Sequence, residues 1–99
     1  MSTPTTYTVD SILKSLGYVD PMMAARQQAR MILLGKKSRY QAEIQKLASK
    51  WNLSLEQMRQ KYEHEGVENF AADDDYTQWQ WYADAVDAID SQLEVLAAN

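Results

Sequence analysis

The sequence predicts an all-α protein, folded as a long helical hairpin or a small helical bundle. Three features indicate this fold: apolar residues recur every three or four positions, helix-capping patterns precede these runs, and no stretch alternates apolar and polar residues as a strand does. With 99 residues, we expect one domain, residues 1–99. Its core is small enough that a homodimer through the remaining apolar helix surface would add burial.

The N-terminal part of the chain predicts a short helix after a polar segment. Residues 1–7 are polar and are expected to be disordered. Thr8 or Asp10 then offers a side-chain oxygen that suits a helix N-cap. This helix should run to Leu16 and stop at Gly17, because glycine readily adopts the left-handed conformation that ends helices.

A long second helix is predicted from Asp20-Pro21 to about Trp51. A capping carboxylate followed by proline at the first helical position is a strong start signal. The apolar side of this helix is close to a heptad pattern. It comprises Met22, Ala29, Leu33, Tyr40, Ile44, Leu47 and Trp51.

Two alternatives remain open at Gly35, inside this helix. Glycine in a helix interior costs about 1 kcal/mol relative to alanine, and Ser38 could cap a new helix, which would divide the segment in two. However, Leu33 and Tyr40 are one heptad apart and stay in phase if the helix continues. We favour a single long helix.

A short third helix is expected over about residues 55–64, ending at Gly66. Asn52 suits a left-handed stop of the preceding helix, and Ser54 with Gln57 has the spacing of a capping box.

The last helix has the most regular pattern in the chain. Asp73, Asp74 and Asp75 lie where a helix N-terminus favours negative charge. After them, apolar residues step by three and four along a seam that predicts packing against another helix. The seam is formed by Trp79, Tyr82, Val86, Ile89, Leu93 and Leu96.

Charge divides the chain into a basic half (8–61) and an acidic half (62–99). Residues 1–61 contain ten Lys and Arg and four Asp and Glu, a balance of +6, whereas residues 62–99 contain ten Asp and Glu and no Lys or Arg, a balance of −10. Such asymmetry points to nucleic acid or a charged protein as partner. It therefore indicates a binding protein rather than an enzyme.

The acidic half combines carboxylates with aromatic rings, the features of a nucleic acid that a basic protein recognises. We therefore expect protein–protein recognition with a small basic partner. The residues expected to contact it are Asp73, Asp74, Asp75, Tyr76, Trp81, Asp84, Asp87 and Asp90. Trp81 lies off the apolar seam, so it either contacts the partner directly or covers the short helix or a dimer mate.

The basic residues from Arg26 to Lys50 also have two explanations. They form an ordinary solvated helix face, or they neutralise the acidic half within one molecule or across a dimer. Surface ion pairs contribute about 0–1 kcal/mol each, so such pairs would set register and partner choice more than stability.

Residues 47–62 suggest an alternative function, a small DNA-binding regulator. The spacing fits a helix-turn-helix with Asn52 in the turn and Ser54 at the start of the second helix. The same pattern fits an ordinary corner between two helices. A structural adaptor whose helices bridge subunits is a further alternative. The residues suited to contact DNA are Lys50, Gln57, Arg59 and Lys61.

No catalytic, metal or cofactor site is expected. The acidic run at 73–75 lacks the alternating spacing and the glycine of a calcium loop. His64 is the only histidine and cysteine is absent, which leaves too few ligands for zinc.

The sequence also bears on location. No apolar run approaches the roughly 20 residues of a membrane-spanning helix, so we expect no membrane partner. The first ten residues lack the basic and apolar regions of a secretory signal, and a cytoplasmic location is therefore expected.

A set of residues within positions 36–82 carries a resemblance to a known family. It consists of Lys37, Tyr40, Glu43, Ile44, the run Trp51-Asn52-Leu53-Ser54-Leu55-Glu56, Asp74-Asp75-Tyr76 and Trp79. This set resembles small all-helical prokaryotic antitoxins, which are encoded beside small toxins in toxin–antitoxin pairs. The family pattern has an aromatic–glycine turn where this chain has Trp51-Asn52, and asparagine tolerates the left-handed conformation. The resemblance implies a non-enzymatic protein that binds and neutralises a toxin and, when autoregulating, binds DNA upstream of its own genes.

Overall fold

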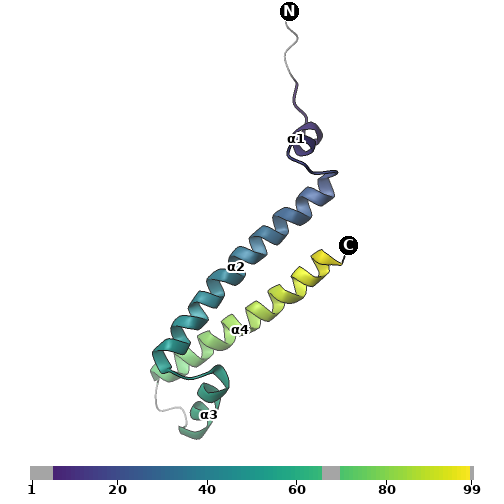
Figure 1. Cartoon of the computed structure of the whole chain (residues 1–99). Coiled ribbons are helices and arrows are strands. Elements are labelled where there is room, and N and C mark those ends of the chain that lie inside the picture. Colours follow the sequence, from purple (N-terminus) through teal and green to yellow (C-terminus); the bar gives the residue numbers. More distant parts are fainter. Residues whose placement is uncertain (1–5, 66–69, 99) are drawn as a thin grey trace, which may run out of the picture. The chain divides into compact units, whose positions relative to one another are not determined.

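The computed structural model describes residues 6–65 and 70–98, and the regular structure within them is entirely helical (Figure 1). This part of the chain contains α1 (Val9–Ser15), α2 (Pro21–Trp51), α3 (Leu55–Glu65) and α4 (Phe70–Ala97). The all-α prediction is confirmed. The chain forms two compact units, Met1–Ile32 and Leu33–Asn99, and the boundary between them lies within α2.

The first unit contains α1 and the first part of α2. Thr8 and Ser11 form a reciprocal capping box: Thr8 Oγ1 accepts a hydrogen bond from the Ser11 N–H at 3.0 Å, and Ser11 Oγ accepts one from the Thr8 N–H at 2.9 Å. Thr8, and not Asp10, is therefore the N-cap. Gly17 has a φ of 95°, so it stops α1 in the left-handed conformation, as its position predicts.

α2 begins where the sequence predicts. Asp20 Oδ1 accepts a hydrogen bond of 2.7 Å from the Met23 N–H, which is an N-cap interaction. The helix then continues for 31 residues and passes through Gly35 without interruption. The single-helix alternative is therefore correct.

The predicted apolar side of α2 is packed against other residues only in the second part of the helix. Leu47 is buried, and Tyr40 and Ile44 are half-buried. Met22, at the other end of the same side, is 68% exposed. No side chain of residues 6–32 is buried, so the first part of α2 lacks the packing that its pattern predicts.

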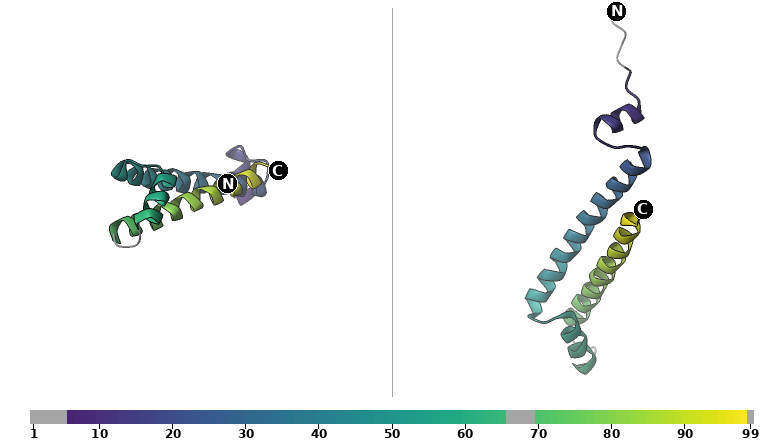
Figure 2. Two further views of the ribbon diagram at one scale, coloured as in Figure 1. Left: turned by 90° about the horizontal axis from the view of Figure 1, so that it is seen from below. Right: turned by 45° about the vertical axis from the view of Figure 1, so that its right-hand side comes forward.

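In the second unit, α4 runs beside α2 in the opposite direction, and α3 lies at the end where α2 stops (Figure 1 and Figure 2). This is the predicted helical hairpin. Asn52 ends α2 with a φ of 54°. Ser54 and Gln57 cap α3 reciprocally, with the Ser54 N–H 2.9 Å from Gln57 Oε1 and the Gln57 N–H 3.1 Å from Ser54 Oγ. Both turn predictions are confirmed.

The core lies where the three helices of this unit meet. Met58 of α3 is completely enclosed, against Leu47 of α2 and Ala72 and Trp79 of α4. Burial of a methionine side chain contributes about 1.5–3 kcal/mol, so Met58 holds α3 against both long helices. Further along α4, the seam residue Ile89 is also buried, and the half-buried seam residues are Tyr82, Val86, Leu93 and Leu96.

The start of α4 corrects one detail of the prediction. The helix begins at Phe70, so Asp73 lies in its first turn, and Asp74 and Asp75 lie in the second. The predicted end of the short helix at Gly66 lies outside the described residues, as do positions 1–5 of the segment expected to be disordered.

Candidate functional site

Six of the seven acidic residues of α4 divide into two groups that face different directions. Asp75 and Asp90 face α2 and form ion pairs with it. Lys50 Nζ lies 2.6 Å from Asp75 Oδ2, and Lys37 Nζ lies 2.6 Å from Asp90 Oδ1. The exposed acids of the helix are Asp74, Asp84, Asp87 and Glu94.

Asp75 connects the end of α2 to the beginning of α4. Besides its pair with Lys50, its Oδ2 atom accepts a hydrogen bond of 2.8 Å from the Trp51 indole N–H. The side chain is only 15% exposed. Burial raises the pKa of Asp75, but the hydrogen bonds from Lys50 and Trp51 and the charge of Lys50 outweigh burial, so the pKa lies below its ordinary value. The chain itself therefore satisfies this carboxylate.

Asp73 and Tyr76 contact α3 through one residue, Tyr62. The Tyr62 hydroxyl is hydrogen-bonded to Asp73, which raises the pKa of Tyr62, and burial and the negative charge of Asp73 act in the same direction. The rings of Tyr62 and Tyr76 are stacked, with centroids 5.1 Å apart and planes 8° from parallel. These two predicted partner-binding residues therefore attach α3 to α4.

Trp81 packs on α2 but remains largely accessible. Its ring meets the Tyr40 ring edge-on, with centroids 5.4 Å apart and an interplanar angle of 77°. Tyr82 contacts both rings, at 5.3 Å from Trp81 and 5.6 Å from Tyr40. Trp81 is nevertheless 57% exposed. One edge of the indole thus supports the hairpin while the rest is open to solvent.

We call Asp84, Asp87 and Glu94 the outer acidic face of α4. Asp84 and Asp87 are one helical turn apart, and Glu94 lies two turns beyond Asp87. Asp84 accepts a hydrogen bond of 3.0 Å from Gln80 Nε2. Asp87 and Glu94 form no ion pair with any residue that the structure describes, and α4 contains no Lys or Arg to reduce their field. The outer acidic face is therefore free to attract a cationic surface.

Each of the two explanations given for the basic residues of α2 holds for some of them. Lys37 and Lys50 neutralise acids of α4 within the same molecule. Lys36 and Arg39 are exposed and form no ion pair within the described residues, as expected of a solvated helix face.

The four residues suited to contact DNA do not form one free basic surface. Arg59 donates hydrogen bonds to two neighbours on α3, from Nε to Glu56 Oε2 at 3.0 Å and from Nη1 to Glu63 Oε1 at 2.8 Å. The hydrogen bond and charge of Glu56, then those of Glu63, raise the pKa of Arg59. Lys50 is paired with Asp75, and Gln57 uses Oε1 in the cap of α3.

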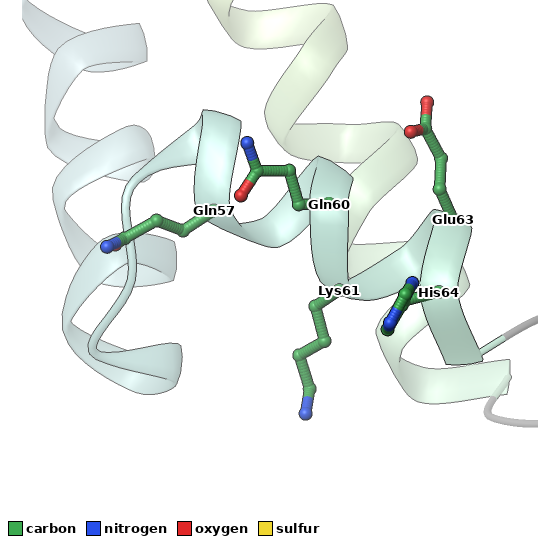
Figure 3. A pocket seen from close by; sticks show the side chains of 5 residues that line it. All are labelled: Gln57, Gln60, Lys61, Glu63 and His64. Carbon is green, nitrogen blue, oxygen red and sulfur yellow. The ribbon is translucent and has the colours of Figure 1, made fainter.

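A surface hollow runs along the exposed side of α3. It is lined by Gln57, Gln60, Lys61, Glu63 and His64. Figure 3 shows that these side chains spread outward in different directions: Gln60 and Glu63 extend to one side of the helix, and Lys61 and His64 to the other. Catalysis and metal binding require groups that converge on one point, and this arrangement does not provide it.

The described part of the chain contains neither a cluster of metal-ligating side chains nor a membrane-spanning helix. No three His, Asp or Glu side chains there are placed to hold a metal ion. None of its helices has both the length and the apolar composition needed to cross a bilayer. Comparisons with protein-family models, curated proteins and solved structures found no match.

Two features of the site were not predicted from the sequence. Glu94 belongs to the outer acidic face, and its spacing of seven from Asp87 was the signal that it shares that face. Tyr40 of α2 and Trp81 of α4 are in contact although they lie 41 positions apart along the chain. The periodicity of a single helix contains no signal for such a contact.

Proposed function

We propose that this chain is a protein-binding module of the antitoxin type, which binds a small basic protein through the outer acidic face of α4. The observation that supports this proposal is the separation of the acids by direction. Asp75 and Asp90 are neutralised by lysines of α2, whereas Asp84, Asp87 and Glu94 face solvent. Charges that served only to pair α4 with α2 would face α2, so the outward acids remain available to another molecule.

Trp81 adds an apolar contact to this surface. It lies one helical turn before Asp84 and is 57% exposed. Aromatic residues dominate the energetics of many protein interfaces, and an indole fixed on one edge loses little conformational entropy on binding. The carboxylates would accelerate association with a basic partner. Trp81 would supply much of the binding affinity once the complex has formed.

Four other residues predicted to contact the partner have another role in this proposal. Asp73, Asp75, Tyr76 and Asp90 hold α2, α3 and α4 together and so keep the outer acidic face in place. An inhibitor of this kind has no need of catalytic groups, and we propose a cytoplasmic location for it.

DNA binding is the alternative with less support. Arg59 is held by Glu56 and Glu63, and both acids would lie close to a phosphate that approached it. A regulator of this kind would bind DNA upstream of its own coding region, with an affinity that falls steeply as salt increases.

The test is affinity capture of the tagged full chain from its native host at low salt, with mass spectrometry of the bound proteins. The wild type is compared with D84N/D87N/E94Q and with a control, Q45K/Q78K/Q92K. Each substitution in either variant adds one unit of positive charge, and the control positions are exposed and outside the outer acidic face. The proposal expects one small basic protein with the wild type and the control, and its loss with the first variant. Equal recovery with all three chains would contradict it.

A further inference from the structure

The closed end of the hairpin contains a cationic side chain that contacts both an indole and a carboxylate. Lys50 Nζ lies 5.7 Å from the centroid of the Trp51 ring and 2.6 Å from Asp75 Oδ2. The electron-rich face of an indole attracts a cation, and the carboxylate adds a charge-assisted hydrogen bond. Three groups therefore act together at this end of the hairpin: an aromatic ring, a carboxylate and the cation that contacts both.

Trp81 and Asp84 repeat two of these three groups on the exposed surface of α4. Asp84 lies one helical turn beyond Trp81, and residues at this spacing have Cβ atoms about 5–6 Å apart. Asp84 Oδ1 accepts a hydrogen bond of 3.0 Å from Gln80 Nε2, so the carboxylate leans back over the turn that carries Trp81. In the described part of the chain, no lysine or arginine lies over the Trp81 ring as Lys50 lies over Trp51. The pair therefore lacks a cation of its own.

The Trp81 ring is held in place and is also accessible. The rings of Tyr40 and Tyr82 meet it at interplanar angles of 77° and 81°. The side chain is nevertheless 57% exposed. A ring that its neighbours already immobilise loses little conformational entropy when a ligand stacks on it. The open part of the indole can therefore receive a flat cationic group at low cost.

We propose that Trp81 and Asp84 bind one arginine side chain of the basic partner, with the guanidinium stacked on the indole and its N–H groups directed to the carboxylate. This inference rests on the proposed function and adds which group of the partner is recognised. A guanidinium is planar and weakly hydrated, so it can stack on a ring while its edge donates hydrogen bonds. The ammonium of lysine is compact and strongly hydrated, and it lacks this flat surface. The pair should therefore prefer arginine to lysine.

The rest of the outer acidic face has a different task from this pair. Asp87 lies one helical turn beyond Asp84, and Glu94 lies two turns farther, so neither carboxylate is adjacent to Trp81. These two acids attract lysine and arginine alike, because their interaction depends on charge. A preference for arginine should therefore depend on the indole, whereas attraction to cations in general depends on the carboxylates.

The first test measures binding of the full chain to fluorescently labelled hexa-arginine and hexa-lysine peptides at low salt. The wild type should bind hexa-arginine more tightly than hexa-lysine. W81L should bind hexa-arginine about twofold to fivefold more weakly than the wild type, the range of a cation–π contact at an exposed site, and should lose the preference. The matched control is V95A, because Val95 is also an exposed apolar residue of α4 and lies outside the pair. V95A should keep the preference, and circular dichroism verifies that both variants remain helical.

The second test uses the wild type, so it does not depend on the folding of a variant. The chain has three tryptophans, and each contributes one indole N–H signal to the ¹⁵N–¹H spectrum. Addition of hexa-arginine should shift the signal of Trp81. The signal of Trp79, which is only 2% exposed, should stay in place.

Three results would overturn the proposal. They are equal affinity of the wild type for the two peptides, an arginine preference in W81L that equals that of the wild type, and a Trp81 signal that does not shift at saturating hexa-arginine. Failure of the proposed function gives a different result, because D84N/D87N/E94Q would then bind both peptides as tightly as the wild type does. If the wild type binds both peptides equally and D84N/D87N/E94Q binds neither, the outer acidic face is retained and the arginine site is rejected.

Discussion

The indole N–H of Trp51 donates a hydrogen bond of 2.8 Å to the carboxylate of Asp75, 24 residues further along the chain. Trp51 is the last residue of α2, and Asp75 lies in the second turn of α4. The same carboxylate oxygen also receives Lys50 at 2.6 Å. This contact fixes the closed end of the hairpin and so determines which side of α4 faces α2.

Loss of the Asp75 carboxylate should destabilise the hairpin. D75A leaves the half-buried Trp51 N–H without its acceptor and Lys50 without its partner, at a cost of about 2 kcal/mol, since hydrogen bonds to charged groups contribute about 1.5–3 kcal/mol. D75N keeps an acceptor oxygen for Trp51 and should cost roughly half as much. Urea unfolding followed by circular dichroism measures both values. Equal midpoints for D75A and the wild type would show that this contact does not support the hairpin.

Stability should also fall in acid because of Asp75. Its pKa is lower in the folded chain than its ordinary value of 3.8, because the hydrogen bonds from Lys50 and Trp51 favour the ionised form. A carboxylate with a lowered folded pKa adds stability at pH values above its unfolded pKa. This contribution is lost as the pH falls from about 4 toward the folded pKa. Melting temperatures between pH 7 and pH 2 should therefore decrease below pH 4 more steeply for the wild type than for D75N.

Truncation of Met58 should strongly destabilise the second unit. Its side chain has no exposed surface, and truncation of a buried methionine to alanine costs about 2–5 kcal/mol. M58A should therefore detach α3 or unfold the second unit. The matched control is M31A, because Met31 is 64% exposed on α2 and its truncation should change stability by less than about 0.5 kcal/mol. Similar losses for the two variants would mean that α3 is not held by Met58.

Asn52 should prefer replacement by glycine over alanine. Its φ of 54° lies in the left-handed region, where a residue with a Cβ other than asparagine or aspartate loses about 1–2 kcal/mol. N52G should be at least as stable as the wild type, and N52A should be less stable by about 1 kcal/mol. Chemical denaturation distinguishes the two, and greater stability of N52A would indicate a different turn.

The helix limits and the turns could be predicted from the sequence because their signals are local. Asp20-Pro21, Asn52 and the Ser54–Gln57 pair each act within four residues of the backbone groups that they satisfy. The seam of α4 could also be predicted, because apolar residues at spacings of three and four lie on one face of a helix. No partner helix has to be known for such predictions.

The lysine partners of individual acids could not be predicted in the same way. Asp84, Asp87 and Asp90 follow one another at intervals of three residues along α4. Of these three acids, only Asp90 forms an ion pair with a lysine of α2. That outcome depends on the pairing of Lys37 with Asp90 across two helices, which local spacing does not contain. The exposure of Met22 was missed for the opposite reason, because its pattern predicts a packed face but does not say whether the same chain covers it.

In the proposed function, Asp84, Asp87 and Glu94 bind a basic protein, while the acids that face α2 maintain the fold. The decisive measurement is isothermal titration calorimetry with the captured partner, using the wild type, D84N/D87N/E94Q and the control Q45K/Q78K/Q92K. We expect the first variant to bind at least about tenfold more weakly, a loss of about 1.4 kcal/mol or more, with unchanged helicity, and the control to bind like the wild type. Equal affinity for the wild type and D84N/D87N/E94Q would contradict it.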